Sequence, residues 1–119
     1  MTRGRYVVCG PQGAGKTTWV NRHARLGDYR WDLDAVAACL TLGTLTLPSQ
    51  LKGKLPRPTL ELLLFLRESF VDWVGVVGHL GDARVFVIVH DQEVARVIAH
   101  ELRAKLVRVD QDHRVRWIA

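Results

Sequence analysis

The stretch YVVCGPQGAGKTTWV, residues 6–20, decides the fold of this chain. Its first four residues are apolar, which is typical of a strand buried on both faces of a sheet. From Gly15 to about Arg25 the spacing of apolar residues predicts a helix. A glycine-rich turn joins the two, and this order of strand, turn and helix predicts the first unit of an α/β domain.

The rest of the chain continues the alternation of strands and helices. Further strands are expected in YRWDLD (29–34), ARVFVIVH (83–90) and KLVRVD (105–110), and further helices in AVAACLTL (35–42), TLELLLFLRESFVDWVGVV (59–77) and QEVARVIAHELRA (92–104). The tail HRVRWIA (113–119) is expected to add an edge strand or a short packed segment. We therefore expect one α/β domain over residues 1–119, a small, mostly parallel sheet with helices on both faces. The helix over 59–77 is apolar around much of its circumference, which predicts that it is well buried.

Residues 43–58, GTLTLPSQLKGKLPRP, interrupt this pattern. They contain three prolines and two glycines and show no sustained periodicity, so we expect a loop insert. Its basic residues Lys52, Lys54 and Arg57 suit a lid or a substrate-binding segment, and a solvated loop is the simpler interpretation.

Composition narrows the class of protein. The chain has 119 residues, of which 48% are hydrophobic and 24% charged, as in ordinary globular domains. The net charge of +5 favours anionic partners such as nucleotides, although the basic residues are scattered along the chain. Its two cysteines, Cys9 and Cys39, are expected to be buried free thiols. No leader pattern or membrane-length apolar run is evident, so we expect a cytoplasmic protein without a membrane partner.

Residues 10–17 match the pattern G-x-x-x-x-G-K-[ST] in full, between a predicted strand and a predicted helix. Such a loop holds phosphates through backbone N–H groups and the helix N-terminus, while the lysine reaches the β- and γ-phosphates and the hydroxyl binds Mg²⁺. The pattern thus predicts a P-loop NTPase fold that binds a nucleoside triphosphate and Mg²⁺. Because the sequence lacks the Asn-Lys-x-Asp motif of GTPases, we expect ATP. The predicted nucleotide-binding residues are Gly10, Pro11, Gln12, Gly13, Ala14, Gly15, Lys16, Thr17 and Thr18.

Three aspartates follow predicted strands and are candidates for chemistry at the phosphate. Asp32 and Asp34 end the second strand and, two residues apart, would point the same way, where a carboxylate can accept a proton from an attacking hydroxyl. Asp34 also suits the N-cap of the next helix. Asp91 directly follows the strand over 83–90 and is predicted to help hold Mg²⁺ with Thr17, or to cap the following helix.

Arginines are needed to stabilise charge on a transferred phosphoryl group. Arg67 is the most distinctive candidate because it lies within an otherwise apolar helix, although each arginine taken alone also suits a solvated surface. The candidate phosphate-clamp arginines are Arg67, Arg96, Arg114 and Arg116.

The segment YVVCGPQGAGKTTWVNRHA, followed by WDLDAVAACL, resembles the start of small phage and bacterial P-loop kinases related to polynucleotide kinase and zeta-toxin-type kinases. Residues 83–110 are similar in pattern to the later strand, helix and strand of these proteins. The resemblance implies an ATP-dependent phosphotransferase in which Asp34, with Asp32 beside it, acts as base toward the acceptor hydroxyl and Lys16 binds the transferred phosphate. It also implies an arginine-bearing lid, whose role falls on Arg114, Arg116, residues 43–58 or another subunit.

Three functions stay open on these grounds. The first is a kinase whose acceptor is a nucleotide, a nucleic-acid end or a small metabolite. The second is an ATPase, in which water takes the place of the acceptor. The third is a nucleotide-dependent binding module, in which the apolar helix over 59–77 would form the face of a homodimer.

Overall fold

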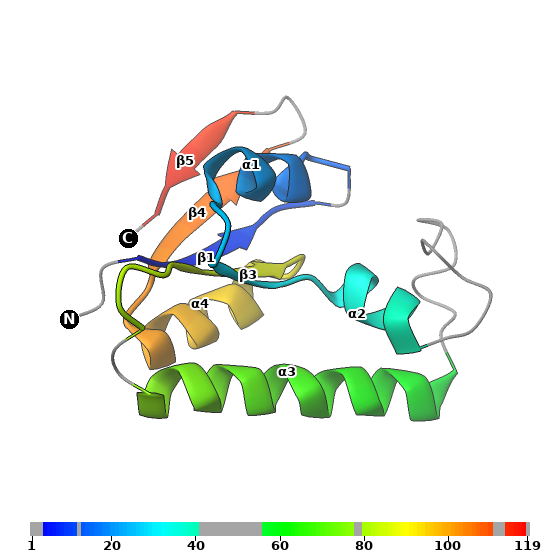
Figure 1. The fold of residues 1–119 in the computed structure, drawn as a ribbon. Coiled ribbons are helices and arrows are strands. Elements are labelled where there is room, and N and C mark those ends of the chain that lie inside the picture. Colours follow the sequence, from blue (N-terminus) through cyan, green and yellow to red (C-terminus); the bar gives the residue numbers. More distant parts are fainter. Residues whose placement is uncertain (1–3, 12, 41–55, 78–79, 111–113, 119) are drawn as a thin grey trace.

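Five strands form a single sheet in the order β2–β3–β1–β4–β5 (Figure 1). The computed structural model describes residues 4–11, 13–40, 56–77, 80–110 and 114–118. The strands are β1 (Arg5–Cys9), β2 (Tyr29–Trp31), β3 (Val85–Val89), β4 (Lys105–Val109) and β5 (Val115–Trp117). The helices are α1 (Lys16–His23), α2 (Leu33–Leu40), α3 (Arg57–Val77) and α4 (Gln92–Leu102).

The sheet is mixed. β2, β3, β1 and β4 pair with their neighbours in parallel, whereas β5 runs antiparallel to β4. A parallel partner for β4 would need a crossover of about a dozen residues, and the short connection over 110–114 allows only a reversal of direction. The α/β class expected from the sequence is therefore confirmed, with an antiparallel edge strand supplied by the tail.

Helices cover both faces of the sheet. The chain leaves β1 toward β2 and leaves β3 toward β4, and right-handed crossovers in opposite directions place their helices on opposite faces. Accordingly α1 lies over one face, while α3 and α4 lie on the other (Figure 1). The alternation along each central strand serves this arrangement: Val7 and Cys9 belong to the core beneath α3 and α4, and Val8 to the core beneath α1.

The boundary between β2 and α2 differs from the one expected. The strand ends at Trp31, whose partner on β3 is Val87, and the helix begins two residues later. The carboxylate of Asp32 accepts a hydrogen bond from the backbone N–H of Asp34 over 3.1 Å, which makes Asp32 the N-cap of α2. The expectation that Asp34 ends the strand and caps the helix is therefore wrong, and Asp34 lies in the first helical turn.

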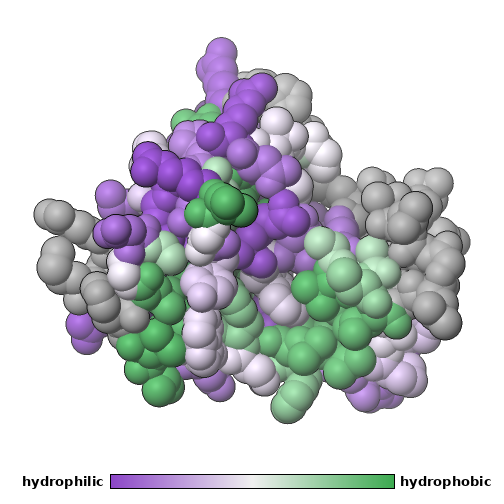
Figure 2. All heavy atoms as spheres, in the orientation of Figure 1, coloured by the Kyte–Doolittle hydropathy of each residue, from purple (hydrophilic) through white to green (hydrophobic). Residues whose placement is uncertain are grey.

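α3 begins at Arg57, two residues earlier than expected, and buries one face only. Leu63, Val71 and Val74 are buried, whereas Phe65 is 64% exposed and Val76 is 86% exposed. Figure 2 shows hydrophobic residues gathered over the lower part of the molecule, where α3 lies. The expectation of a well-buried helix is wrong, because apolar residues all round a helix do not reveal how many neighbours cover it. Most of the expected loop insert, residues 41–55, lies outside the described residues.

Two further findings bear on the surroundings of the chain. Cys9 is buried and Cys39 is exposed, and both are free thiols, so the expectation that both are buried holds for Cys9 alone. Among the helices of the described residues, none is both long enough and apolar enough to cross a membrane.

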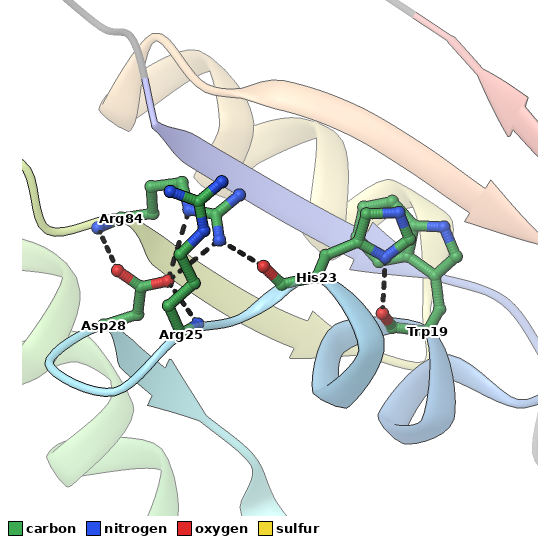
Figure 3. A network of polar contacts seen from close by, with 5 residues as sticks. All are labelled: Trp19, His23, Arg25, Asp28 and Arg84. Carbon is green, nitrogen blue, oxygen red and sulfur yellow. Dashed lines mark hydrogen bonds and ion pairs between the residues drawn. The ribbon is translucent and has the colours of Figure 1, made fainter.

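A polar network around Asp28 fixes the end of α1 against the sheet (Figure 3). The Asp28 carboxylate accepts hydrogen bonds from the backbone N–H groups of Arg25 and Arg84, each over 2.8 Å, and pairs with the Arg84 guanidinium at 3.2 Å. The same guanidinium donates to the carbonyl oxygen of His23 at the end of α1. Burial alone would raise the pKa of Asp28, but these donors outweigh burial and hold its pKa below the ordinary 3.8.

Replacing Asp28 by Asn should lower the free energy of unfolding at neutral pH by about 1–3 kcal/mol, because hydrogen bonds to a buried charge are lost. A lowered pKa in the folded state means that the contribution of Asp28 is present above pH 3.8 and is lost as the pH falls through the folded-state value. In urea unfolding measured between pH 2 and 7, the free energy of unfolding should therefore fall less toward acid pH in the Asp28→Asn variant than in the unmodified chain. The exposed Asp82→Asn is the matched control, and equal behaviour of the two variants would contradict the assignment.

Candidate functional site

A cavity of about 450 Å³ lies at the carboxyl ends of β1, β2 and β3. The chain leaves β1 and β3, which are neighbours, in opposite directions, and ligands of open α/β sheets bind at such a switch point. The cavity is also within the size range of small-molecule sites. The residues that line it come from the glycine-rich loop and α1, from the end of β2 and the start of α2, from α3, and from the β3–α4 connection.

The loop between β1 and α1 has the backbone that its glycines predict. Gly10, Gly13 and Gly15 have φ angles of 147°, 80° and 96°, a region that other residues rarely adopt. Gly15 is the N-cap of α1, and having no side chain it offers no cap to the N–H groups of the first turn. These groups point toward the cavity end of the helix, as an anion site requires. The left-handed Gly15 and the extended Ala24 shorten α1 at both ends relative to the expected helix.

Gly10 also allows a close approach between neighbouring strands. A Cβ atom built on Gly10 would lie 2.1 Å from the carbonyl oxygen of Val109 at the end of β4. By contrast, a Cβ atom on Gly13 would meet nothing within 4 Å. The two glycines therefore serve different purposes, close packing at Gly10 and backbone conformation alone at Gly13.

Lys16 is the buried charge of the site. Its residue is 5% exposed, and its Nζ donates to the carbonyl oxygens of Gly10 and Pro11, each over 2.7 Å. The ammonium group thus lies against the inner side of the loop, at the floor of the cavity. A buried ammonium is costly unless hydrogen bonds and anions surround it, so this position favours an anionic ligand.

Thr17 and Asp32 come together from α1 and the end of β2. The Thr17 hydroxyl donates to Oδ2 of Asp32 over 3.3 Å, while Oδ1 of the same carboxylate caps α2. Asp34 lines the same cavity from the first turn of α2, with its Oδ1 atom buried. Capping fixes the orientation of Asp32, and Asp32 and Asp34 both lie in the cavity as predicted.

Asp91 and His90 line the cavity from the β3–α4 connection. Asp91 is the N-cap of α4 and accepts from the backbone N–H of Glu93 over 2.8 Å. Of its two predicted roles, the helix cap is the one the structure confirms. Within the described ranges no group of three or more His, Cys, Asp or Glu side chains is arranged to hold a metal ion.

Of the four candidate arginines, Arg67 lines the cavity. It reaches there from the middle of α3 and is half-buried. Arg96, Arg114 and Arg116 are exposed and are not among the described residues that line the cavity. Arg116 instead pairs with Asp110 at 3.1 Å, where a hydrogen bond from Arg108 holds the pKa of Asp110 below its ordinary value.

A second hollow of about 350 Å³ adjoins the loop on the side of β4 and β5. Gly15 and Thr18 line both this hollow and the cavity, which places the two on either side of the helix start. Trp19 and Arg22 of α1 line it together with Val109 and Val115. A flat, partly apolar group can lie in this hollow while a group attached to it reaches the loop.

The sequence pattern identified most of the charged residues of the site and missed its apolar walls. Trp31, Leu33, Ile88, Val89 and Val94 line the cavity and were predicted only as parts of strands or helices. The contact between Thr17 and Asp32 was also missed, although their positions at the ends of neighbouring elements contained the signal. Gln12 of the predicted loop lies outside the described residues.

Comparison of the chain with models of protein families, with curated proteins and with solved structures finds no significant match.

Gly10→Ala should lower the free energy of unfolding by about 2–4 kcal/mol, because it combines backbone strain with a clash against Val109. Gly13→Ala has backbone strain alone and should cost about 1–2 kcal/mol. Thermal and urea unfolding of the two variants measures the difference. Equal destabilisation would mean that β1 and β4 do not approach as closely as described.

Proposed function

We propose that the chain binds ATP with Mg²⁺ and transfers the γ-phosphoryl group to an acceptor hydroxyl. The observation that carries the proposal is the position of Lys16, a buried ammonium held by the carbonyl oxygens of Gly10 and Pro11 at the floor of the cavity. A triphosphate would place its β- and γ-phosphates over Lys16 and the N–H groups of Gly13 and Gly15. The adenine ring of ATP would lie in the adjoining hollow beside Trp19.

Mg²⁺ fits the donors at the start of α1. The Thr17 hydroxyl and the Asp32 carboxylate are hard oxygen donors 3.3 Å apart, and Mg²⁺ in phosphate sites takes one or two protein oxygens together with phosphate oxygens and water. Thr17 and Asp32 would hold the ion, which would neutralise charge on the phosphate oxygens. This assignment favours Asp32 over Asp91 because the Asp32 carboxylate contacts the Thr17 hydroxyl.

The transfer needs a base for the acceptor and a cation for the transferred group. Asp34 would take the proton from the acceptor hydroxyl while the oxygen of that hydroxyl bonds to the γ-phosphorus. The bond between the γ-phosphorus and the oxygen bridging to the β-phosphate breaks at the same time, and ADP leaves with that oxygen. Arg67, which lines the same cavity from α3, would stabilise charge on the equatorial oxygens.

The test is transfer of labelled γ-phosphate from ATP in the presence of Mg²⁺ and a panel of hydroxyl acceptors. Asp34→Asn should bind ATP normally and lower transfer by about a hundredfold to ten-thousandfold, because the base is lost. Asp82→Asn, an exposed aspartate outside the cavity, should leave both unchanged.

Transfer that is unaffected by Asp34→Asn would remove Asp34 from the mechanism. Label released only as free phosphate would indicate an ATPase, and ATP that binds without any turnover would indicate a nucleotide-dependent binding module.

A further inference from the structure

A groove of about 300 Å³ runs between α3 and α4 and adjoins the cavity. Arg67 and Val94 line both spaces, Arg67 from α3 and Val94 from α4. A molecule in the groove would therefore have one end at Arg67, where the cavity begins. The proposed function leaves this groove unused.

The groove has an apolar floor of limited size. Val71 and Ile98 are 5% and 6% exposed and form its base, and Val97, which is 58% exposed, forms its rim. A volume of about 300 Å³ suits a small organic molecule and not a nucleic-acid duplex. The floor favours a ligand with an apolar body.

The charged side chains of the groove are mainly acidic. Glu68 and Asp72 project from α3 and Glu101 from α4, against the single guanidinium of Arg67 at the junction with the cavity. This local excess of carboxylates opposes the net charge of +5 carried by the whole chain. Like charges repel, so the groove disfavours phosphorylated or carboxylated ligands and favours a cation along its length.

We infer that this groove binds the acceptor, and that the acceptor is a small amine-bearing alcohol with an apolar body. The inference rests on the proposed phosphoryl transfer and names the substrate class for it. The hydroxyl would lie beside Arg67 facing the γ-phosphate, the apolar body over Val71 and Ile98, and the ammonium near Glu101 and Asp72. Its O–H proton would pass to Asp34, as in the general mechanism, yielding the phosphate ester and ADP.

Nuclear magnetic resonance tests the inference at both sites in one sample. The full chain, with labelled valine and isoleucine methyl groups and labelled glycine amides, is first saturated with Mg²⁺ and a non-hydrolysable ATP analogue. The para-aminomethyl, para-methyl and para-carboxy derivatives of phenethyl alcohol are then titrated, because all three are primary alcohols and they carry a positive, a neutral and a negative group at the opposite end of the phenyl ring.

The aminomethyl derivative should shift the methyl resonances of Val97 and Ile98 and reach half-saturation at a concentration about threefold to tenfold lower than the neutral derivative, with the carboxylate weakest. The double variant Asp72→Asn with Glu101→Gln should abolish this ranking. Glu61→Gln, an exposed glutamate at the other end of α3, is the matched control and should preserve it.

Equal half-saturation by the three alcohols, preference for the carboxylate, or no methyl shift with the aminomethyl derivative would overturn the inference. None of these outcomes would contradict the proposed binding of ATP, provided that the analogue has shifted the amide resonances of Gly13 and Gly15. Failure of the analogue to shift those two amides would contradict the proposed function and, with it, the inference.

Discussion

The rest of the site depends on how the chain turns from β1 into α1. Between the buried Cys9 and the first helical residue, Lys16, three glycines adopt positive φ angles, and Gly10 packs directly against the Val109 carbonyl. This turn aims the N-terminus of α1 at the carboxyl edge of the sheet. It also folds Lys16 back over the loop and brings Thr17 toward Asp32. A side chain at Gly10 would displace β4 or the loop, and each of these contacts would change.

The topology of the sheet brings the remaining charged side chains of the site to its carboxyl edge. Parallel pairing of β2, β3 and β1 places their carboxyl ends side by side, so the residues that follow them converge although they are far apart in sequence. Asp32 follows β2 and Asp91 follows β3, and each caps the helix that comes next. Helix capping and site formation use the same carboxylates, which ties the stability of α2 to the orientation of Asp32. Arg67 joins them because α3 packs along α4 beneath the cavity.

Much of this arrangement was predictable where the signal is local. The glycine pattern predicted the loop over 10–17, and the apolar run before Asp91 predicted both β3 and a cap for α4. Which of Asp32 and Asp34 caps α2 was not predictable, since this depends on where β2 stops pairing with β3. The exposed face of α3 was likewise missed, because apolar periodicity does not state how many neighbours a helix has. The inward reach of Arg67 was suggested by its apolar surroundings in sequence, but its place beside Val94 required the packing of α3 against α4.

The central claim is that the loop holds the phosphates of a nucleotide. Equilibrium dialysis of labelled ATP with Mg²⁺, in competition with either inorganic tripolyphosphate or adenosine, tests it most directly. If Lys16 and the loop amides supply the binding energy, tripolyphosphate displaces ATP and adenosine at the same concentration does not. Absence of ATP binding, or displacement by adenosine but not by tripolyphosphate, would contradict the claim.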